Sequence, residues 1–212
     1  MSYPSPPWTL QGHALLTLNL IDIQRVRPLI PKELDIIPVL PGKTLGGVYL
    51  SFYGSGSILE YHELIVVAAI TRYQDHISPW VSHIYVDNPE SVAGGREIWG
   101  LPKEIAEFTW ENDHVSVRQG DISLCAMNYK RSKFPNLATP FPIPAFHLSI
   151  LDSNILGFSS QFKFRCELIK NTLEVYPESP FNSLALEQPW LTGYFNKLHI
   201  LVGEPKVIGK IT

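Results

Sequence analysis

The sequence predicts a mainly β (α+β) domain, in which a few short helices accompany many short strands. Eighteen prolines and 14 glycines are spread along the 212 residues, and they leave little room for long helices. Between these breakers lie short segments rich in β-branched and aromatic residues, several of which alternate apolar and polar side chains. An antiparallel barrel, closed or nearly closed, is the expected arrangement because it leaves few strand edges unpaired.

The first half of the chain contains four predicted strands and two predicted helical segments. Residues 63–73 are almost continuously apolar, which is typical of a strand buried on both faces. Asn88 and Pro89 suit the N-cap and the first turn of a short helix. The strands are expected at residues 13–20, 45–53, 63–73 and 80–86, and the helical turns at residues 21–29 and 89–98.

The second half opens with the most regular pattern, which predicts an antiparallel meander at residues 105–127. Phe108 and Trp110 alternate with polar residues, and turn-forming pairs follow at residues 112–113 and 120–121. The remaining expectations are a Pro-rich loop at residues 130–146, an alternating strand at 161–176, a short helix interrupted by a proline at 182–196, and a final strand with a tail at 197–211.

Size and charge limit the classes of partner. The length suits one domain over residues 1–212, although two closely packed halves would also fit. The formal net charge is −3 and no run of Lys or Arg stands out, so neither nucleic acid nor an acidic membrane surface is an expected partner. The start has no basic segment followed by an apolar stretch, so no signal peptide is expected. The longest strongly apolar run, residues 64–70, is far shorter than the ~20 residues that cross a membrane.

Cysteine and histidine usage gives no sign of a metal or disulfide framework. Cys125 and Cys166 are expected to be buried thiols in a reducing cytoplasm. The seven histidines are scattered without metal-ligand spacing. Glycine-rich nucleotide-binding loops are absent as well, so neither a metal nor a nucleotide or flavin cofactor is expected.

Residues 84–108 read IYVDNPESVAGGREIWGLPKEIAEF, and this segment resembles the signature of the acetoacetate decarboxylase family. In that family, a Tyr-x-Asp-Asn stretch leads through Gly-Arg-Glu to a Pro-Lys pair. Residues 61–63 also resemble the family's Tyr-x-Glu strand, and residues 166–169 resemble a late family strand. The positions of the central motif that fall in register are Tyr85, Asp87, Asn88, Gly95, Arg96, Glu97, Pro102 and Lys103.

The resemblance implies a cone-like antiparallel β-barrel around an apolar cavity. It also implies that Lys103 is the nucleophile, which forms an imine (a Schiff base) with a keto substrate, and that Glu63 is its acidic partner. A free lysine, with a pKa of roughly 10.4, is almost wholly protonated at pH 7 and cannot attack a carbonyl. Activation by desolvation or by a neighbouring cation is established for acetoacetate decarboxylase itself, so this point is inherited from the family.

Three positions depart from the family pattern. The second lysine of the family's decarboxylases is Glu104 in this chain, which cannot supply a positive charge. An arginine expected near the first strand has no match at residues 11–13, and an acidic residue expected upstream of Glu63 falls within residues 48–50. The nucleophile and one acid are therefore retained, whereas the groups expected to bind the substrate carboxylate are not.

Four further residues are candidate substrate contacts, each with a structural alternative. Tyr61 and Trp99 suit either a pocket wall or the hydrophobic core. Arg96 suits a substrate contact, an ion pair or a helix cap. Glu104 either replaces the second lysine or faces solvent, and it points away from Lys103 if that lysine lies in extended backbone.

Glu63 lies in the most apolar predicted strand, where a carboxylate needs a specific reason because burying it is costly. A catalytic explanation is a general acid or base whose pKa is tuned by burial. A structural explanation is an ion pair with Arg72 or Arg96. The sequence leaves both open.

The favoured prediction is a carbon–carbon lyase that decarboxylates a small or medium keto acid through an imine on Lys103. A protonated imine also accepts electrons in aldol-type condensation and in dehydration, so these reactions are the second possibility. A non-enzymatic barrel that binds a hydrophobic metabolite, with Lys103 as a polar anchor, is the third. A homo-oligomer is expected, and a degenerate scaffold within an assembly is a further alternative.

Overall fold

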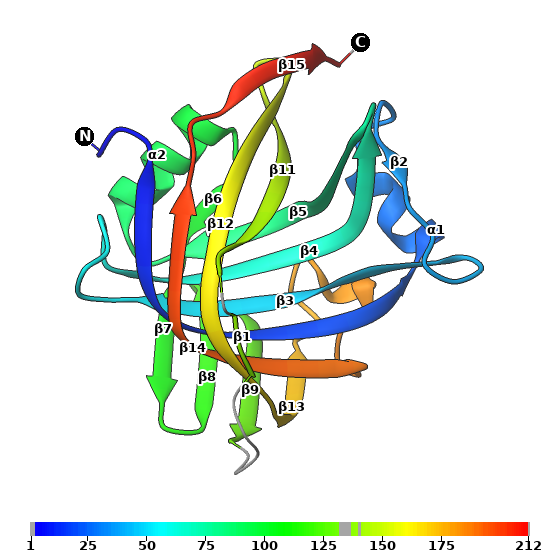
Figure 1. Cartoon of the computed structure of the whole chain (residues 1–212). Helices are drawn as coiled ribbons and strands as arrows, with labels where there is room; N and C mark the ends of the chain where they lie inside the picture. The colour runs from blue at the N-terminus through cyan, green and yellow to red at the C-terminus, as the bar shows by residue number, and fades with distance from the viewer. Residues whose placement is uncertain (1–2, 132–136, 140, 212) are drawn as a thin grey trace.

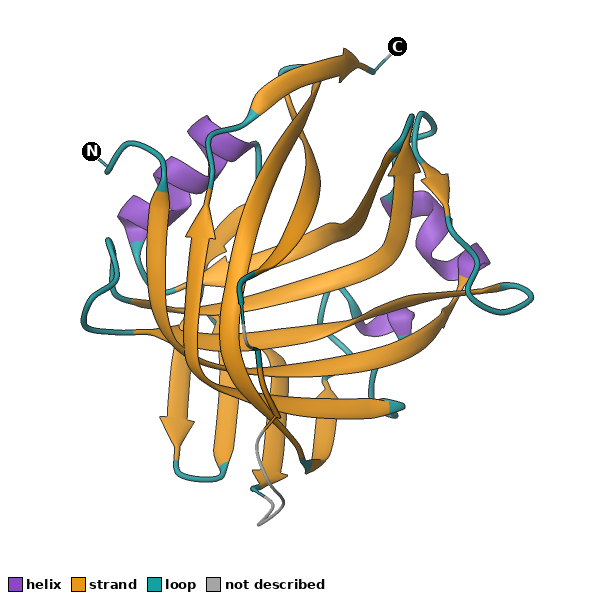
Figure 2. Cartoon of the chain, viewed as in Figure 1, coloured by secondary structure: helices purple, strands orange, loops and turns teal. Residues whose placement is uncertain are grey.

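The computed structural model describes residues 3–131, 137–139 and 141–211, and strands dominate it (Figure 2). The predicted mainly β fold with a few short helices is confirmed. The helical elements are α1 (Ile23–Val26), η1 (Arg27–Leu29), α2 (Pro89–Trp99) and η2 (Asn182–Leu184). The strands are β1 (Trp8–Asp22), β2 (Asp35–Ile36), β3 (Lys43–Tyr53), β4 (Tyr61–Tyr73), β5 (His76–Val86), β6 (Lys103–Ile105), β7 (Glu107–Glu111), β8 (His114–Gln119), β9 (Ile122–Lys130), β10 (Leu137–Ala138), β11 (Ile143–Leu151), β12 (Asn154–Leu168), β13 (Lys170–Val175), β14 (Leu191–Val202) and β15 (Lys206–Lys210).

Eleven of these strands form one strongly curled sheet (Figure 1). Neighbours run in the order β10-β12-β14-β1-β3-β4-β5-β6, with β11 and β15 added to β12, and β2 added to β4. The pairing is antiparallel throughout, except between β5 and β6. The curl brings β11 beside β5, where the Leu148 amide donates to Ser78 Oγ at 2.9 Å and the rings of His76 and Phe146 stack. The sheet therefore wraps around an interior as a half-barrel, which supports the expected barrel-like fold class, although the strand order stays open between β10 and β6.

A second sheet of four strands, in the order β13-β9-β8-β7, packs against the outside of the curl (Figure 1). Because successive side chains of a strand point to opposite faces, one face of β4 contacts the hydrophobic core and the other faces the interior of the curl. Leu64 and Val66 point outward and share the main hydrophobic core with Val115 and Leu124 of the small sheet. Glu63, Ile65 and Val67, which alternate with Leu64 and Val66 along the strand, point inward. The predicted meander at residues 105–127 is confirmed as β7, β8 and β9.

Helix α2 connects β5 to the short parallel strand β6, and its predicted start is confirmed. The Asn88 side chain accepts hydrogen bonds from the amides of Glu90 at 2.9 Å and Ser91 at 3.1 Å. The helix ends at Gly100, whose φ of 60° lies in the left-handed region that favours glycine. This tight ending lets the chain turn back along β5 within three residues and begin β6 at Lys103.

Three predictions for the second half of the chain are wrong. The strand expected at residues 161–176 is two strands in different sheets, because β12 ends at Leu168 and β13 begins at Lys170. The loop predicted at residues 130–146 includes strand at both ends, because β9 continues to Lys130 and β11 begins at Ile143; residues 132–136 and 140 lie outside the described residues. Of the helix predicted at residues 182–196, only the turn η2 forms, and β14 begins at Leu191. Strand β14 forms because it pairs with both β1 and β12, and a local sequence does not show such long-range pairing. Strand β11 instead forms a hairpin with β12, in which Leu151 pairs with Asn154 across a two-residue turn, so the signal for it was local and was missed.

Replacing Asn88 by alanine removes both capping hydrogen bonds at the start of α2. We expect the free energy of unfolding to fall by about 1 kcal/mol, measured by urea denaturation followed by circular dichroism. Asn112→Ala is the matched control, because Asn112 is exposed in the turn between β7 and β8, and it should change the stability by less than about 0.5 kcal/mol. Equal stability of the two variants would mean that the cap does not hold α2.

Candidate active site

The side chain of Lys103 enters the interior of the curl and is only 3% exposed. Its Nζ atom donates to Glu63 Oε1 at 2.8 Å and to Ser91 Oγ at 2.9 Å. The three residues come from β6, β4 and the first turn of α2, so the contact joins three separate elements. Glu63 is 4% exposed, so the ion pair is removed from water. The cationic partner of Glu63 is Lys103 and not Arg72 or Arg96, which were the structural alternatives.

Two further residues of α2 hold the lysine in place. Gly95 packs so closely against the lysine stem that a Cβ atom there would lie 2.5 Å from Lys103 Cδ. Arg96 donates from Nε to the backbone carbonyl of Lys103 at 2.6 Å. Arg96 is exposed and does not line the cavity, so its predicted role as a substrate contact is corrected. It supports the backbone of β6 instead.

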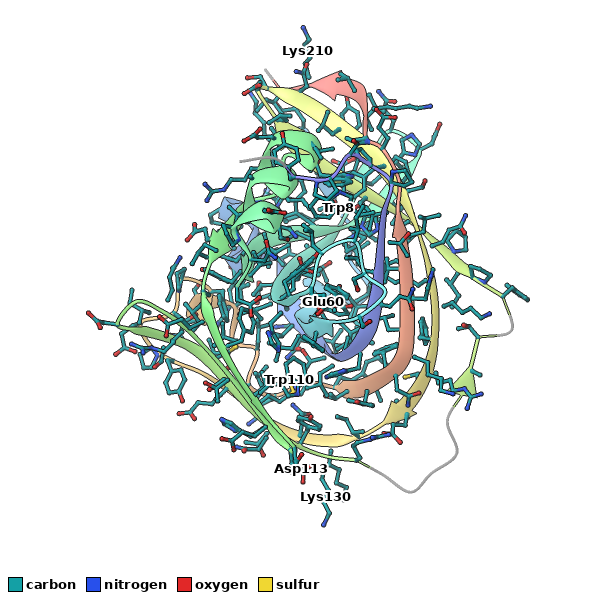
Figure 3. All side chains as sticks on the ribbon, turned by 90° about the vertical axis from the view of Figure 1, so that its left-hand side faces the viewer. Trp8, Glu60, Trp110, Asp113, Lys130 and Lys210 are labelled. Carbon is teal, nitrogen blue, oxygen red and sulfur yellow. The ribbon has the colours of Figure 1, made fainter. Side chains whose placement is uncertain are left out.

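Aromatic rings surround the amine. Nζ lies 4.9 Å from the centre of the Tyr61 ring and 5.9 Å from that of the Trp8 ring, distances typical of cation–π contacts. Trp99 meets Trp8 edge to face with 4.8 Å between ring centres, and both rings line the cavity together with Tyr61. Figure 3 shows Trp8 in the upper interior beside α2, whereas Trp110 lies lower, where the small sheet meets the curled one. These rings keep water from the amine and stabilise a positive charge on it.

A chain of hydroxyl groups continues from the other oxygen of Glu63. The Tyr53 hydroxyl donates to Glu63 Oε2 at 3.2 Å, and the Tyr49 hydroxyl lies 3.1 Å from that of Tyr53. Burial raises the pKa of Tyr49, Tyr53 and Tyr61, so all three hydroxyls stay protonated near neutral pH. Tyr49 belongs to the stretch in which the family's upstream acid was expected, so a neutral hydroxyl lines the cavity from this stretch.

The amine forms part of the wall of a cavity of about 530 Å³ inside the curl. Its lining side chains are mainly aliphatic and aromatic. Lys103 and Glu63 are the only charged residues among those that line it in the described part of the chain, because burial lowers the pKa of His147 to about 4 and leaves that ring neutral at pH 7. His147 Nε2 and Ser160 Oγ lie 2.6 Å apart and satisfy each other. No arginine lines this cavity within the described residues, which agrees with the missing match at residues 11–13.

Glu104 points away from the cavity. It follows the buried Lys103 in extended backbone, so its side chain is exposed on the opposite side of β6. Its Oε2 atom accepts a hydrogen bond from Gln119 Nε2 at 2.7 Å, which ties β6 to the small sheet. The prediction that Glu104 contacts substrate is therefore corrected. The position of the family's second lysine does not face the amine in this chain.

Sequence reasoning missed three residues that surround Lys103, namely Ser91, Tyr53 and Trp8. A signal existed for Ser91, because it precedes Gly95 by four residues and helical spacing places both on one face of α2. Tyr53 and Trp8 gave no such signal. Only the pairing of β3 with β4 sets Tyr53 opposite Tyr61, and only the curl of the sheet brings Trp8 to the amine.

The described residues offer no other obvious chemical centre. Within residues 3–131, 137–139 and 141–211, no group of three or more His, Cys, Asp and Glu side chains is arranged to hold a metal ion. Cys125 and Cys166 are both free thiols, but only Cys125 is buried as expected, whereas Cys166 is partly exposed. Burial raises the pKa of Cys125 to about 12. In the same described part of the chain, no helix has the length and apolar character needed to cross a membrane.

Comparison with known proteins supports the motif and the fold together. Residues 1–188 match the family described as acetoacetate decarboxylase (ADC). This chain belongs to the acetoacetate decarboxylase family. An acetoacetate decarboxylase of Ralstonia nicotianae is 24% identical over 185 residues, which are 82% of this chain and 70% of that protein.

Other proteins similar to this chain differ in size and name. Protein NEOXANTHIN-DEFICIENT 1 of Solanum lycopersicum is 32% identical over 109 residues, which are 51% of this chain but only 37% of that relative. Among solved structures, acetoacetate decarboxylase from Legionella pneumophila superposes with a TM-score of 0.80 at 16% identity, covering 99% of this chain and 90% of that chain. The enduracididine biosynthesis enzyme MppR complexed with pyruvate gives 0.71 at 12% identity, covering 99% and 93%. The structural likenesses show the fold.

Gly95→Ala tests whether α2 positions the amine. The added methyl group would collide with the stem of Lys103, whereas alanine is compatible with the helix itself. We expect borohydride trapping of an imine between Lys103 and a keto acid to slow by roughly tenfold or more. Circular dichroism should remain that of the parent protein. Unchanged trapping would show that the contact between Gly95 and the stem does not align the amine.

The low pKa of His147 should make the stability depend on pH in a defined window. The folded protein keeps this ring neutral down to about pH 4, whereas an unfolded chain, with the ordinary histidine pKa of 6.5, takes up the proton below that value. Between these values the unfolded state binds more protons, so lowering the pH from 6.5 to 4 should destabilise the fold. We expect a loss of at most about 3 kcal/mol, measured by urea denaturation at each pH.

Two variants separate His147 from other titrating groups. His147→Gln keeps a polar partner for Ser160 but cannot titrate, so its stability should vary less between pH 6.5 and 4. His199→Gln is the control, because His199 is exposed on β14, and it should keep the slope of the parent protein. If His147→Gln also keeps that slope, the pH dependence has another origin.

Proposed function

We propose that the protein is a Schiff-base-forming lyase that decarboxylates a keto acid through an imine on Lys103. The observation that carries the proposal is the buried contact between Lys103 Nζ and Glu63 Oε1 at the wall of an apolar cavity. A nucleophilic amine, a proton acceptor and a water-poor space for a carbonyl compound occur together there. No metal or organic cofactor is required, because the imine itself is the electron sink.

In the first stage, Lys103 and Glu63 exchange protons while the imine forms. Glu63 Oε1 takes a proton from the ammonium group, and the neutral amine adds to the carbonyl carbon of the substrate. One proton moves from the nitrogen to the oxygen of this adduct, which gives the carbinolamine. Glu63 then returns its proton to the carbinolamine hydroxyl, which leaves as water, so the products are a protonated imine and a Glu63 carboxylate. The Tyr61 and Trp8 rings face the positive charge that develops at Nζ.

In the second stage, the carbon–carbon bond to the carboxylate breaks. Its electron pair moves into the protonated imine, which becomes a neutral enamine, and carbon dioxide leaves. The α-carbon of the enamine then needs a proton from solvent, and the hydroxyls of Tyr49 and Tyr53 with Glu63 form a route for it. Water finally hydrolyses the imine to release the ketone and regenerate Lys103. The overall reaction consumes one proton for each carbon dioxide released.

Aldol-type condensation is the second candidate reaction, and the surroundings of the amine are compatible with it. The enamine is a carbon nucleophile, and the cavity has room for a second carbonyl compound. The cavity also lacks a second lysine and an arginine among its described lining residues. One structure of similar fold is MppR complexed with the condensation product of pyruvate and imidazole 4-carboxaldehyde. A binding barrel without catalysis would use the same cavity but would form no covalent adduct.

Reductive trapping tests the proposal. The protein is incubated with acetoacetate and with a panel of 2- and 3-keto acids, borohydride is added, and the adduct is located by peptide mass spectrometry. With a 3-keto acid we expect an adduct on Lys103, with a mass that shows the loss of carbon dioxide, whereas a 2-keto acid, whose carboxylate is on the imine carbon, should give an adduct that keeps it. Glu63→Gln should slow trapping by roughly 10²–10⁴-fold, because it removes the proton acceptor but keeps a hydrogen-bonding group. Glu60→Gln, a change in an exposed residue nearby, should have no effect.

Loss of the lysine needs its own control. Lys103→Ala should abolish the adduct, but it leaves Glu63 buried without its partner, which typically costs about 3–5 kcal/mol of stability. The double variant Lys103→Met/Glu63→Gln removes both charges and should fold without forming an adduct. An adduct of a 3-keto acid that keeps its carboxylate would favour condensation chemistry. The absence of any adduct in a folded parent protein would favour the binding barrel.

A further inference from the structure

The apolar cavity is much larger than a small keto acid requires. If each methylene occupies about the 30 Å³ that one water takes in the liquid, 530 Å³ holds roughly 17 non-hydrogen atoms. Acetoacetate has about seven. A small substrate would leave most of the cavity empty or filled with water that finds few partners on its walls.

The reactive groups occupy one part of this cavity. On β4, lining residues extend from Tyr61 past Glu63 to Ile70, and a strand rises about 3.3 Å per residue, so Glu63 and Ile70 are roughly 20 Å apart along the strand. The polar network of Lys103, Glu63 and the tyrosines lies toward the Tyr61 end. Beyond it the wall from β1, β3 and β4 is almost wholly apolar, and its partly exposed side chains are Leu16, Leu18, Leu45, Ile65, Val67 and Ile70.

The few polar groups elsewhere in the wall are already satisfied. Thr17 Oγ1 is bonded to Asn19 Oδ1 at 3.0 Å and accepts from the Val48 amide at 2.9 Å. His147 and Ser160 bond to each other, and the ring is neutral. Within the described lining, therefore, only the Lys103 amine can balance a negative charge on a ligand.

We infer that the substrate is a 3-keto acid whose carbonyl carries a long, uncharged hydrocarbon chain of roughly ten carbons or more. The inference rests on the proposed imine chemistry. The carbonyl and carboxylate lie at Lys103, and the chain follows β4 toward Ile70, where it covers apolar side chains that otherwise face the cavity. The carboxylate has the protonated imine as its one counter-charge, and it loses its own charge when carbon dioxide departs.

A homologous series of 3-keto acids tests this inference. Acetoacetate, 3-oxohexanoate, 3-oxodecanoate and 3-oxotetradecanoate are trapped with borohydride, and the concentration for half-maximal labelling of Lys103 is measured. We expect this concentration to fall by roughly two- to fourfold for each added methylene until the cavity is full. Equal or weaker labelling by the longer acids would overturn the inference while leaving the imine chemistry intact.

Two variants locate the chain. Ile70→Trp fills the far part of the cavity, and it should weaken labelling by 3-oxotetradecanoate at least tenfold without changing labelling by acetoacetate. Val207→Trp is the matched control, because Val207 is 60% exposed on β15 and does not line the cavity, and it should change neither. If Ile70→Trp affects both acids equally, or neither, the chain does not lie along β4.

A measurement that needs no imine separates the two proposals. Trp8 and Trp99 line the cavity, so tetradecan-2-one, which has the chain but no carboxylate, should change the intrinsic fluorescence of both the parent protein and the double variant Lys103→Met/Glu63→Gln. If the ketone binds but no acid gives a trapped adduct, the inference of a long-chain ligand stands and the proposed imine reaction is wrong. If short acids give adducts but the ketone causes no change in fluorescence, the imine reaction stands and the inference of a long-chain substrate is wrong.

Discussion

The buried ion pair between Lys103 and Glu63 is the interaction on which the rest of the site depends. Withdrawing two opposite charges from water costs several kcal/mol for each ion, and their attraction offsets this cost only when further hydrogen bonds satisfy the remaining donors and acceptors. Ser91 supplies one such bond to the amine, and Tyr53 supplies one to the second carboxylate oxygen. A single ionic contact therefore requires β3, β4, β6 and α2 to meet at one place.

The two faces of the curled sheet divide the tasks of stability and chemistry. The outer face of β4 packs on the small sheet through fully buried residues such as Leu64 and Val66, so most of the hydrophobic core lies outside the curl. The inner face can then remain open without a loss of fold. A strand period of two makes this division possible, because alternate residues of the same strand meet the core and the cavity.

Much of the fold could be predicted from the sequence, because alternation and turn residues are local signals. The meander at residues 105–127, the Asn88 cap and the mainly β class depend on such signals and are confirmed. The predicted helix at residues 182–196 is wrong, because partners more than 150 residues away in the chain pull β14 into the sheet beside β1.

The candidate site could likewise be predicted from the sequence only where the signal was local. The spacing of the motif singled out Lys103 and Glu63, which the structure brings together. The motif alone could not show that Arg96 and Glu104 point away from the cavity, since that depends on the end of α2 and on the alternation within β6. The motif could not identify Tyr53, which the pairing of β3 with β4 places near the lysine, or Trp8, which only the curl of the sheet brings to the amine.

The parallel pairing of β6 with β5 has a wider consequence. Lys103 stands on a three-residue strand at the end of the strand order, delivered by one helix that crosses from β5, while the walls of the cavity come mainly from other strands. The reactive lysine and most of the cavity wall therefore belong to different elements of the fold. A change at Lys103 can abolish reactivity while most of the cavity keeps its shape, and a change in the wall far from Glu63 and Tyr61, such as at Ile70, can admit a different ligand without a direct effect on the amine. The reactivity of the lysine and the size of the ligand that the cavity accepts can therefore change largely by separate substitutions.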